Sequence, residues 1–433
     1  MFSLWDVGLW DAGLWKDFTV QTSDATALQA ALDGISATHP PVTYVVSSTI
    51  VIPAGARFDG AGVVTIKQAN GANLSSIVSL QDGAQLIGVT VDGNRANNNA
   101  GQDVAVRIGN SDGCVVDRCT VQNCPGYGVV VNHGLRARIT NNVIKNFYVN
   151  SFAIYADPGV PTYHRIEDNH VSEIGWAFLT AGGSHDIIRN NTVDGHLIGG
   201  PDARMTADMS GNTVTWVSGP DFSDVIVGNF IVFDGGKEFR ITSVASSTSL
   251  TVSTTLPTET GMQAAIGPGD LLGLMGGSHN LVDGNTFVGG ATYGIGMSQA
   301  GNFDTSYNTF SNNNISGCGK TGIVMAYGSG TGVMRGNSIV GNKVRDSGQS
   351  PAGSTLNRCG VAIAGNGRAD KIFGTFIDAN TVDSTHGGDG QMQYWLGTDG
   401  YGGPGEIKIG SNTASGVANG STIYQAGSLV EAV

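Results

Sequence analysis

Short apolar runs recur along the chain around a fixed polar position. The repeating unit is an apolar residue, two residues, an asparagine, one residue and a second apolar residue. Eight copies are centred on Asn142, Asn169, Asn191, Asn285, Asn313, Asn342, Asn380 and Asn412. Two earlier copies, Leu86-Val89-Val91 and Val116-Cys119-Val121, lack the asparagine. Most copies are followed by a second short apolar run, such as GYGVVV or KTGIVM.

Copies at this spacing predict a solenoid, in which each repeat is one rung. The runs are short and bounded by glycine and asparagine, so they favour β-strands that pair in parallel with the rungs above and below. An asparagine that recurs at one corner can hydrogen-bond to its copies in adjacent rungs and satisfy buried turn groups. A β-sandwich is the alternative, but it would not keep asparagine in phase with apolar residues. We expect one stacked inward row, formed by Ile139, Ile166, Ile188, Val282, Ile339 and Ile377.

One gap between copies, from Asn191 to Asn285, is much longer than the others. Four alternating strand patterns fill residues 213–257, with turns at Gly-Pro, Asp-Gly-Gly and Ser-Ser. We therefore expect a small antiparallel β module inserted at a rung corner, over residues 207–272. Residues 19–206 and 273–433 then form the two parts of the solenoid, and the second part includes the C-terminal cap. The stretch DATALQAALDG, residues 24–34, predicts a helix that caps the N-terminal end of the core.

Composition narrows the possible partners. The chain of 433 residues has 66 glycines, only 12 prolines and 40% hydrophobic residues, which is typical of a folded protein. Charged residues make up 13% and the net charge is −13, so nucleic acid is not expected as a partner. No apolar run is long enough to insert into a membrane. The five irregularly spaced cysteines are expected to be buried free thiols, as in a chain folded in a reducing cytoplasm.

Three motifs connect the pattern to a known family. They are the D-x-x-x-L-Q-x-A-L-D helix at Asp24–Asp33, the I-P-x-G-x-x-x-x-G-x-G turn at Ile52–Gly62, and LIGVTVDGN at Leu86–Asn94. With them the chain resembles the pectate-lyase-like superfamily of right-handed parallel β-helices, most closely its phage tailspike and polysaccharide depolymerase members. The resemblance implies an all-β, right-handed parallel β-helix. It does not fix the reaction, because such proteins include lyases, hydrolases, epimerases and adhesive spikes.

The N-terminal stretch SLWDVGLWDAGLWKDF places Trp5, Trp10 and Trp15 five residues apart, a period of neither a helix nor a strand. It resembles short L-W-D repeats of phage virion proteins, and the inserted module resembles small β modules of phage tail proteins. We interpret residues 1–18 as an arm that docks on a neighbouring subunit or on a phage tail or baseplate protein. The alternative is that the tryptophans cover the end of the solenoid itself.

Together these features predict a tailspike-type protein that binds bacterial surface polysaccharide and depolymerises it as a glycoside hydrolase or a polysaccharide lyase. We expect a homotrimer carried on the virion and made in the host cytoplasm. A secreted polysaccharide lyase or epimerase is one alternative. A non-catalytic adhesion or structural spike is the other.

The resembled family binds sugars along the strand that follows the asparagine corner. Aligning that strand on its central apolar residue gives Val129, Ile154, Phe178, Ile295, Ile323, Val361 and Met392. The neighbours of these residues face outward and are mostly apolar or glycine, so polar outward residues are candidates for the site. We predict catalytic residues Asp157, Glu173 and Tyr155. The predicted substrate-binding residues are Lys145, Tyr148, His196, Asp202, Arg204, Gln393 and Trp395.

Two reactions fit these candidates. Asp157 and Glu173 could be the two carboxylates of an inverting glycosidase, whereas Tyr155 with Lys145 or Arg204 could serve a uronate lyase or epimerase. Each candidate also has a purely structural interpretation, since an aspartate before a proline is a common turn residue. No cofactor and no metal site is predicted, although the Asp-Gly pairs leave Ca²⁺ binding open.

Overall fold

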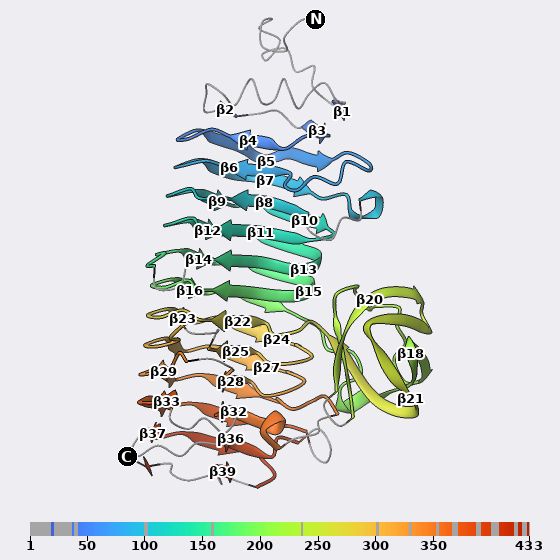
Figure 1. Ribbon diagram of the computed structural model, residues 1–433, viewed down its shortest axis with the longest axis vertical. Helices are drawn as coiled ribbons and strands as arrows, with labels where there is room; N and C mark the ends of the chain where they lie inside the picture. Colours follow the sequence, from blue (N-terminus) through green and yellow to red (C-terminus); the bar gives the residue numbers. More distant parts are fainter. Residues whose placement is uncertain are drawn as a thin grey trace, which may run out of the picture. The chain divides into compact units, whose positions relative to one another are not determined.

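The structure of the protein is a computed structural model, and it describes most of the chain (Figure 1). The described residues are 19–20, 37–38, 42–98, 103–156, 160–234, 237–299, 303–328, 331–351, 355–365, 371–386, 391–399, 407–419, 423–426 and 431–432. The predicted arm, residues 1–18, and the predicted capping helix, residues 24–34, lie outside these ranges. Both stay predictions.

The chain divides into two compact units. Unit 1 comprises residues 1–156 and 162–170, and unit 2 comprises residues 157–161 and 171–433. The strands of unit 1 are β1 (Thr19–Val20), β2 (Ala37–Thr38), β3 (Val42–Val46), β4 (Ile50–Ile52), β5 (Arg57–Gln68), β6 (Val78–Leu80), β7 (Gln85–Asp92), β8 (Val104–Ile108), β9 (Val115–Asp117), β10 (Thr120–Cys124), β11 (Tyr127–Asn132), β12 (Arg138–Thr140), β13 (Val143–Tyr155) and β14 (Arg165–Glu167). A single 3-10 turn, η2 (Arg95–Asn97), follows β7.

Parallel pairing within unit 1 stacks equivalent residues of successive rungs. One inward row runs Phe58, Leu86, Val116, Ile139 and Ile166, all of them buried. Two further rows form on β4, β6, β8, β11 and β13, where Val129 pairs with Phe152 and Val131 pairs with Ile154. The sequence alignment of Val129 with Ile154 is therefore wrong by two residues, because each strand carries two buried apolar residues and the alignment matched the first of β11 with the second of β13.

Unit 2 contains the remaining elements, except for His170, the first residue of β15, which belongs to unit 1. They are β15 (His170–Ala181), β16 (Ile187–Arg189), β17 (Thr192–Asp194), η3 (Pro201–Ala203), β18 (Met205–Ser218), β19 (Phe230–Phe233), β20 (Glu238–Ser246), β21 (Ser249–Gly267), β22 (Leu272–Met275), β23 (Leu281–Asp283), β24 (Thr286–Val288), β25 (Ile295–Ser298), β26 (Thr309–Ser311), β27 (Asn314–Ser316), β28 (Ile323–Ala326), β29 (Met334–Arg335), β30 (Ser338–Val340), β31 (Lys343–Arg345), η4 (Thr355–Arg358), β32 (Cys359–Ala364), β33 (Ile372–Phe373), β34 (Thr375–Asp378), β35 (Thr381–Asp383), β36 (Tyr394–Asp399), β37 (Ile407–Ile409), β38 (Thr413–Ser415), β39 (Ile423–Ala426) and β40 (Glu431–Ala432).

Three columns of parallel strands run through unit 2. On the column that begins with β16, the predicted inward row is confirmed: Ile188, Val282, Phe310, Ile339, Ile377 and Ile409 are register partners. On the column of β22, the aligned residues are Phe178, Leu272, Ile295, Ile323, Val361 and Leu396. The last residue corrects the sequence alignment, which placed Met392 there. Met392 is buried, but it precedes β36.

The recurrent asparagines form a hydrogen-bonded ladder inside unit 2. Each side-chain carbonyl accepts from the backbone N–H and the side-chain amide of the previous asparagine. For Asn313 these two distances, from Asn285, are 3.0 and 2.9 Å. Asn313 in turn donates to Asn342 at 2.9 Å and to the Val282 carbonyl at 3.0 Å. The ladder therefore satisfies corner groups that have no access to water, as predicted. A shorter ladder in unit 1 joins Asn142 to Asn169 at 2.9 Å.

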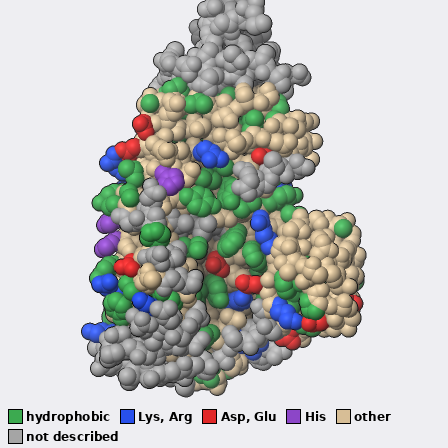
Figure 2. All heavy atoms as spheres, in the orientation of Figure 1, with side chains coloured by type: hydrophobic (Ala, Val, Ile, Leu, Met, Phe, Trp, Pro, Cys, Tyr) green, Lys and Arg blue, Asp and Glu red, His purple; other side chains and the backbone are tan. Residues whose placement is uncertain are grey.

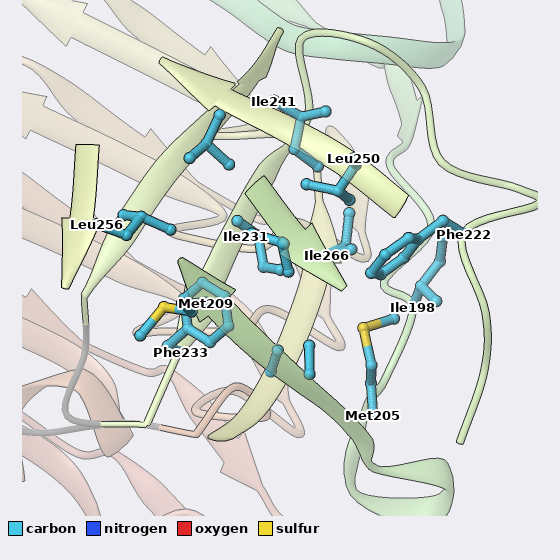
Figure 3. Close-up of a cluster of buried hydrophobic side chains, with 14 residues drawn as sticks. Ile198, Met205, Met209, Phe222, Ile231, Phe233, Ile241, Leu250, Leu256 and Ile266 are labelled. Atoms are coloured by element: carbon cyan, nitrogen blue, oxygen red, sulfur yellow. The ribbon is translucent and has the colours of Figure 1, made fainter. Parts of the chain in front are cut away.

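Strands β18–β21 form a separate four-stranded antiparallel sheet in unit 2, in the order β18-β21-β19-β20. Its strands run from Met205 to Gly267, whereas Leu272 already begins β22, so the module ends before the predicted limit of residue 272. The sheet curls around its own apolar core, which Figure 3 shows with Phe222, Phe233 and Leu250 among its members. All three are fully buried. An inserted antiparallel β module is thus present.

The structure also bears on the cysteines, on metal-binding groups and on membrane-spanning helices. All five cysteines are buried and free, as expected. In the part of the chain that the structure describes, no three His, Cys, Asp or Glu side chains group as metal ligands. Within the same residues, no helix is long and apolar enough to cross a membrane.

Candidate functional site

Titratable and aromatic side chains cluster around Asp270 in unit 2. Asp270 stands in the turn between the last strand of the module, β21, and strand β22. Its carboxylate accepts a hydrogen bond of 2.6 Å from the hydroxyl of Thr292. Gly296 on the neighbouring strand β25 leaves room for this carboxylate, because a Cβ there would lie 2.8 Å from the Asp270 Oδ2 atom. The carboxylate is therefore packed between rungs at a fixed position.

The environment of Asp270 favours its neutral form. Burial raises the pKa of Asp270 to about 6, from an ordinary value of 3.8. The hydrogen bonds from the Thr292 hydroxyl and the Tyr293 backbone N–H oppose this rise in pKa, and so does the positive charge of Lys320. The carboxylate of Glu238 adds to the rise. A carboxyl group with a pKa near neutrality can hold a proton and release it during a reaction.

The inserted module contributes a second carboxylate. Glu238 begins β20, and its Oε2 atom lies 2.5 Å from the Nζ atom of Lys320. The Lys320 side chain is 8% exposed and the Glu238 side chain is 44% exposed. Lys320 belongs to the turn before β28, so the ion pair joins the module to a rung of the helix. The ion pair fixes the position of the Glu238 carboxylate beside the Asp270 turn.

Aromatic side chains flank these charges. The Lys320 Nζ atom lies 5.6 Å from the centroid of the Tyr293 ring. Tyr293, Tyr394 and Leu356 are partly buried and pack against a buried apolar cluster of Val324, Ala362 and Cys359. Burial raises the pKa of Tyr293, and the negative charges of Asp270 and Glu238 raise it further. The Tyr293 hydroxyl therefore stays protonated and can donate hydrogen bonds. We call Asp270, Glu238, Thr292, Tyr293 and Lys320 the Asp270 site.

The Asp270 site lies where the antiparallel module meets the strands of the helix. Figure 2 shows acidic and basic side chains beside apolar ones in the furrow next to the module. The module is held there by Asn229, which donates to the Ile174 carbonyl at 2.8 Å, and by an edge-to-face contact between Phe230 and Trp176. A furrow with paired carboxylates, a cation and aromatic rings can bind a sugar and transfer protons to it.

Three of the residues predicted from sequence lie in unit 1. Tyr155 is half-buried against Val104, Val130 and Ala153. Burial raises its pKa, and its hydrogen-bonded neighbour Tyr127 raises it further, which does not suit the predicted role as a base. Lys145 is half-buried on β13. The ring of Tyr148 lies under the guanidinium of Arg95, whose Cζ atom is 4.2 Å from the ring centroid.

Four more predicted residues lie in unit 2. Glu173 is exposed on β15 with a left-handed backbone, φ 52°. His196 and Asp202 both line an open pocket of about 440 Å³. Asp202 also lies 3.4 Å from the Nδ1 atom of His386. Arg204 donates a hydrogen bond to the backbone carbonyl of Gln349, a bond that ties the start of the module to a later rung.

The last three residues predicted for the site are Asp157, Gln393 and Trp395. Asp157 lies outside the described residues, so its pairing with Glu173 stays a prediction. Gln393 is half-buried, and its backbone N–H donates to the Arg358 carbonyl at 2.8 Å. Trp395 is only 6% exposed. A ring this buried offers no open face to a sugar, which argues against the predicted stacking role of Trp395.

Three residues of the Asp270 site recur at one position of the sequence repeat. Asp270, Tyr293 and Lys320 stand two or three residues before the central apolar residue of β22, β25 and β28. The residues predicted from the sequence come from the neighbours of that apolar position and from turns on other rungs, and these three positions are not among them. Asp270 was also assigned to the module. Glu238 could not be found in this way, because its place depends on how the module folds against the helix.

Two comparisons bear on the family of the chain. The model of the family described as "Right handed beta helix region" matches residues 104–215 and 161–382. These residues make up more than half of the chain, and the match confirms the predicted fold. No curated protein matches this chain in sequence.

Solved structures show the same fold at low sequence identity. The A-module of a mannuronan C-5 epimerase from Azotobacter vinelandii aligns with a TM-score of 0.53 and 15% identity, over 96% of this chain and 100% of that one. Tailspike protein 2 of an Escherichia coli O157:H7 bacteriophage aligns with a TM-score of 0.46 and 8% identity, over 83% of this chain and 40% of that one. An α-1,3-glucanase from Streptomyces thermodiastaticus aligns with a TM-score of 0.45 and 13% identity, over 95% and 64%.

Proposed function

Since the chain belongs to the right-handed β-helix family, we propose that it binds a polysaccharide in the furrow beside its inserted module and cleaves it at the Asp270 site. The observation that carries the proposal is the pair of unlike carboxyl groups. The pKa of Asp270 is raised to about 6, and Glu238 is paired with Lys320 at 2.5 Å. Glycoside hydrolysis uses one protonated and one ionised carboxyl group on either side of the bond that breaks.

In the proposed reaction, Asp270 donates its proton to the oxygen of the glycosidic bond. The Glu238 carboxylate acts on the opposite side, as base towards water or as nucleophile. Tyr293 remains protonated and donates a hydrogen bond to the sugar. Hydrolysis is favoured over lyase chemistry, because a lyase needs a base near the sugar C5 and the raised pKa of Tyr293 does not suit that role.

The test compares D270N and E238Q with matched controls. Asp194→Asn removes an exposed carboxylate of the same unit, and Glu259→Gln removes the module carboxylate that is paired with Lys237 at 2.8 Å. D270N and E238Q should each reduce turnover by at least about 10²-fold, the usual scale for losing a positioned acid or base. Both control variants should keep it.

The assay uses a panel of purified capsular polysaccharides and O-antigens. It records reducing ends together with the ultraviolet absorbance of unsaturated sugar ends. Reducing ends alone support hydrolysis, whereas a rise in both signals would indicate a lyase. Binding without turnover in the wild-type protein would favour the non-catalytic spike. Near-normal turnover in D270N and E238Q would place the reaction elsewhere, with Asp157 and Glu173 as the next candidates.

We also propose that the protein acts as a phage tailspike, a homotrimer attached to the tail through residues 1–18. This rests on the tryptophan repeat and on the resemblance to tailspikes, since these residues lie outside the described ranges. Light scattering should give a mass near three times 44.5 kDa. Deleting residues 1–18 should abolish attachment to phage tails and leave the trimer. A monomeric full-length chain would contradict the proposal.

A further inference from the structure

Arg358 is a half-buried cation of unit 2 whose side chain has no partner among the described residues. It ends the 3-10 turn η4 and stands immediately before strand β32. Its Nε atom is buried, and no group of the described chain accepts a hydrogen bond from it. The two Nη atoms also make no hydrogen bond or ion pair within the described ranges, and they are not among the buried nitrogen atoms. The Nη edge of the guanidinium is therefore open to solvent.

An arginine in this state is unfavourable in the folded chain. A charged donor that is partly removed from water loses hydration, and without an acceptor or an opposite charge it gains nothing in return. Unpaired polar groups of this kind commonly serve a water, an ion or a ligand. Because the Nη atoms of Arg358 stay open, an anion from outside the protein can supply the missing partner.

Strand register places Arg358 in line with the Asp270 site. Ile323 pairs with Val361, so Arg358 stands three residues before Val361 as Lys320 stands three residues before Ile323. Strands β22, β25, β28 and β32 follow one another in this column, which puts Arg358 three rungs from the rung of Asp270. At about 4.8 Å per rung this is roughly 14 Å along the stack. Arg358 thus continues the row of the site away from Asp270.

Packing holds the backbone of Arg358 on both sides. A Cβ atom on Gly348 would lie 2.9 Å from the Arg358 Cα atom, so only glycine lets these segments touch. Gly348 also donates its N–H to the Lys320 carbonyl at 2.8 Å. On the next rung, the Gln393 N–H donates to the Arg358 carbonyl at 2.8 Å. The side chain of Arg358 therefore starts from a fixed point beside Lys320.

The other charges near this point are already engaged. Lys320 is paired with Glu238. Arg204 donates to the backbone carbonyl of Gln349, the residue that follows Gly348. Arg358 is left as a positive charge without a carboxylate from the described chain, although the whole chain carries a net charge of −13. Such a charge attracts an anionic group of a ligand.

We propose that Arg358 binds an anionic substituent of the polysaccharide, at a subsite three rungs from Asp270. Two oxygen atoms of the substituent accept hydrogen bonds from the two Nη groups, a geometry that a carboxylate and a sulfate share. The inference rests on the proposed function, because it names the charge class of the polysaccharide that the Asp270 site receives.

The test measures binding by calorimetry with the full-length chain and three probes. The probes are an oligogalacturonide, a sulfated dextran oligosaccharide and a neutral malto-oligosaccharide of matched length. We expect at least one anionic probe to bind, more weakly at higher salt, and the neutral probe not to bind. R358Q should weaken this binding at least about tenfold, because a hydrogen bond to a charged group is lost.

Two further variants control for folding and for charge. Arg358→Met keeps the apolar stem and loses the charge, so it should weaken binding as R358Q does. Both variants should melt at the temperature of the wild type, because no described hydrogen bond or ion pair is removed. Arg345→Gln removes an exposed arginine of the same unit that is paired with Asp383 at 3.4 Å, and it should leave the affinity unchanged.

The outcomes separate this inference from the proposed cleavage. Preference for the oligogalacturonide identifies a carboxylated sugar, and preference for the sulfated probe identifies a sulfated one. Equal binding of neutral and anionic probes, no anionic binding, or unchanged affinity in a folded Arg358 variant would overturn the inference. Cleavage of neutral polysaccharides alone would do so too and leave the Asp270 proposal standing. Anionic binding that R358Q abolishes, in a protein that cleaves nothing, would support the role of Arg358 and remove the Asp270 proposal.

Discussion

Asp270 illustrates at the scale of one residue how a reactive group costs stability. Its folded pKa of about 6 lies above its ordinary value of 3.8, so the folded chain holds the proton more tightly than the unfolded chain does. Protonation of Asp270 therefore favours folding. The contribution of this protonation to the stability of the folded protein is largest below about pH 4 and is lost as the pH rises through 6.

A prediction follows for the neutral variant D270N. Asparagine can keep the acceptor for Thr292 and carries no charge at any pH, so D270N should melt at a higher temperature than the wild type at pH 8. The advantage should shrink as the pH falls from 6 to 4. Melting curves across this range measure it. If the difference in melting temperature between D270N and the wild type were constant with pH, or absent at pH 8, the pKa of Asp270 would not be raised in the folded protein.

A second prediction at this scale concerns the hydroxyl of Thr292. Its hydrogen bond to Asp270 favours the ionised form and lowers the pKa. Thr292→Val keeps the shape and removes this bond, so the pKa of Asp270 should rise. If Asp270 is the acid, the alkaline limb of the pH–activity profile should move to higher pH. Thr292→Ser keeps the hydroxyl and should leave the limb in place. A limb that moves to lower pH in Thr292→Val would contradict this assignment.

At the scale of the element, the sequence pattern was most informative where side chains point inward. Period and phase were enough to predict the row of Ile188, Val282, Ile339 and Ile377, because a parallel ladder requires equivalent residues to coincide. The pattern failed on β13 and before β36, where strand length and position vary between rungs. Outward residues follow no such constraint. For this reason periodicity places Asp270, Tyr293 and Lys320 at one rung corner but does not show that they form a site, and the position of Glu238 depends on how the module folds.

The asparagine ladder gives a prediction at the same scale. Asn313 is buried, and its side chain makes hydrogen bonds to Asn285, Asn342 and the Val282 carbonyl. Asn313→Ala leaves several of these groups unpaired, at about 1–3 kcal/mol each. We expect a loss of at least about 3 kcal/mol in the free energy of unfolding.

The adjacent Asn314 offers a matched control for that substitution. Its side chain is exposed on β27, so Asn314→Ala should change stability by no more than about 0.5 kcal/mol. Denaturant unfolding of both variants provides the measurement. If both variants lost a similarly small amount of unfolding free energy, the asparagine ladder would not stabilise the fold.

At the scale of the whole molecule, the inserted module combines structural independence with a role in the site. It has its own buried core, and in Figure 1 its strands stand apart from the columns of unit 2. Its entry and exit are adjacent, because Ile198 and Ile266 exchange two backbone hydrogen bonds of 2.7 and 2.8 Å. The module nevertheless supplies Glu238. Insertion at a rung corner can thus add a carboxylate to the furrow without altering the ladder.

Excision of the module tests this division of roles. Replacing residues 198–266 with a two-residue Asn-Gly turn joins Leu197 to Gly267 at points that already lie side by side. Asp270 and the rung strands remain, so we expect a β-rich circular dichroism spectrum and one cooperative unfolding transition. Turnover should fall to the level of E238Q, because Lys320 loses the same partner in both proteins. A molten or aggregated product would show that the module belongs to the core of unit 2. A folded product with full turnover would remove Glu238 from the proposed reaction and leave Asp270 in need of a different partner.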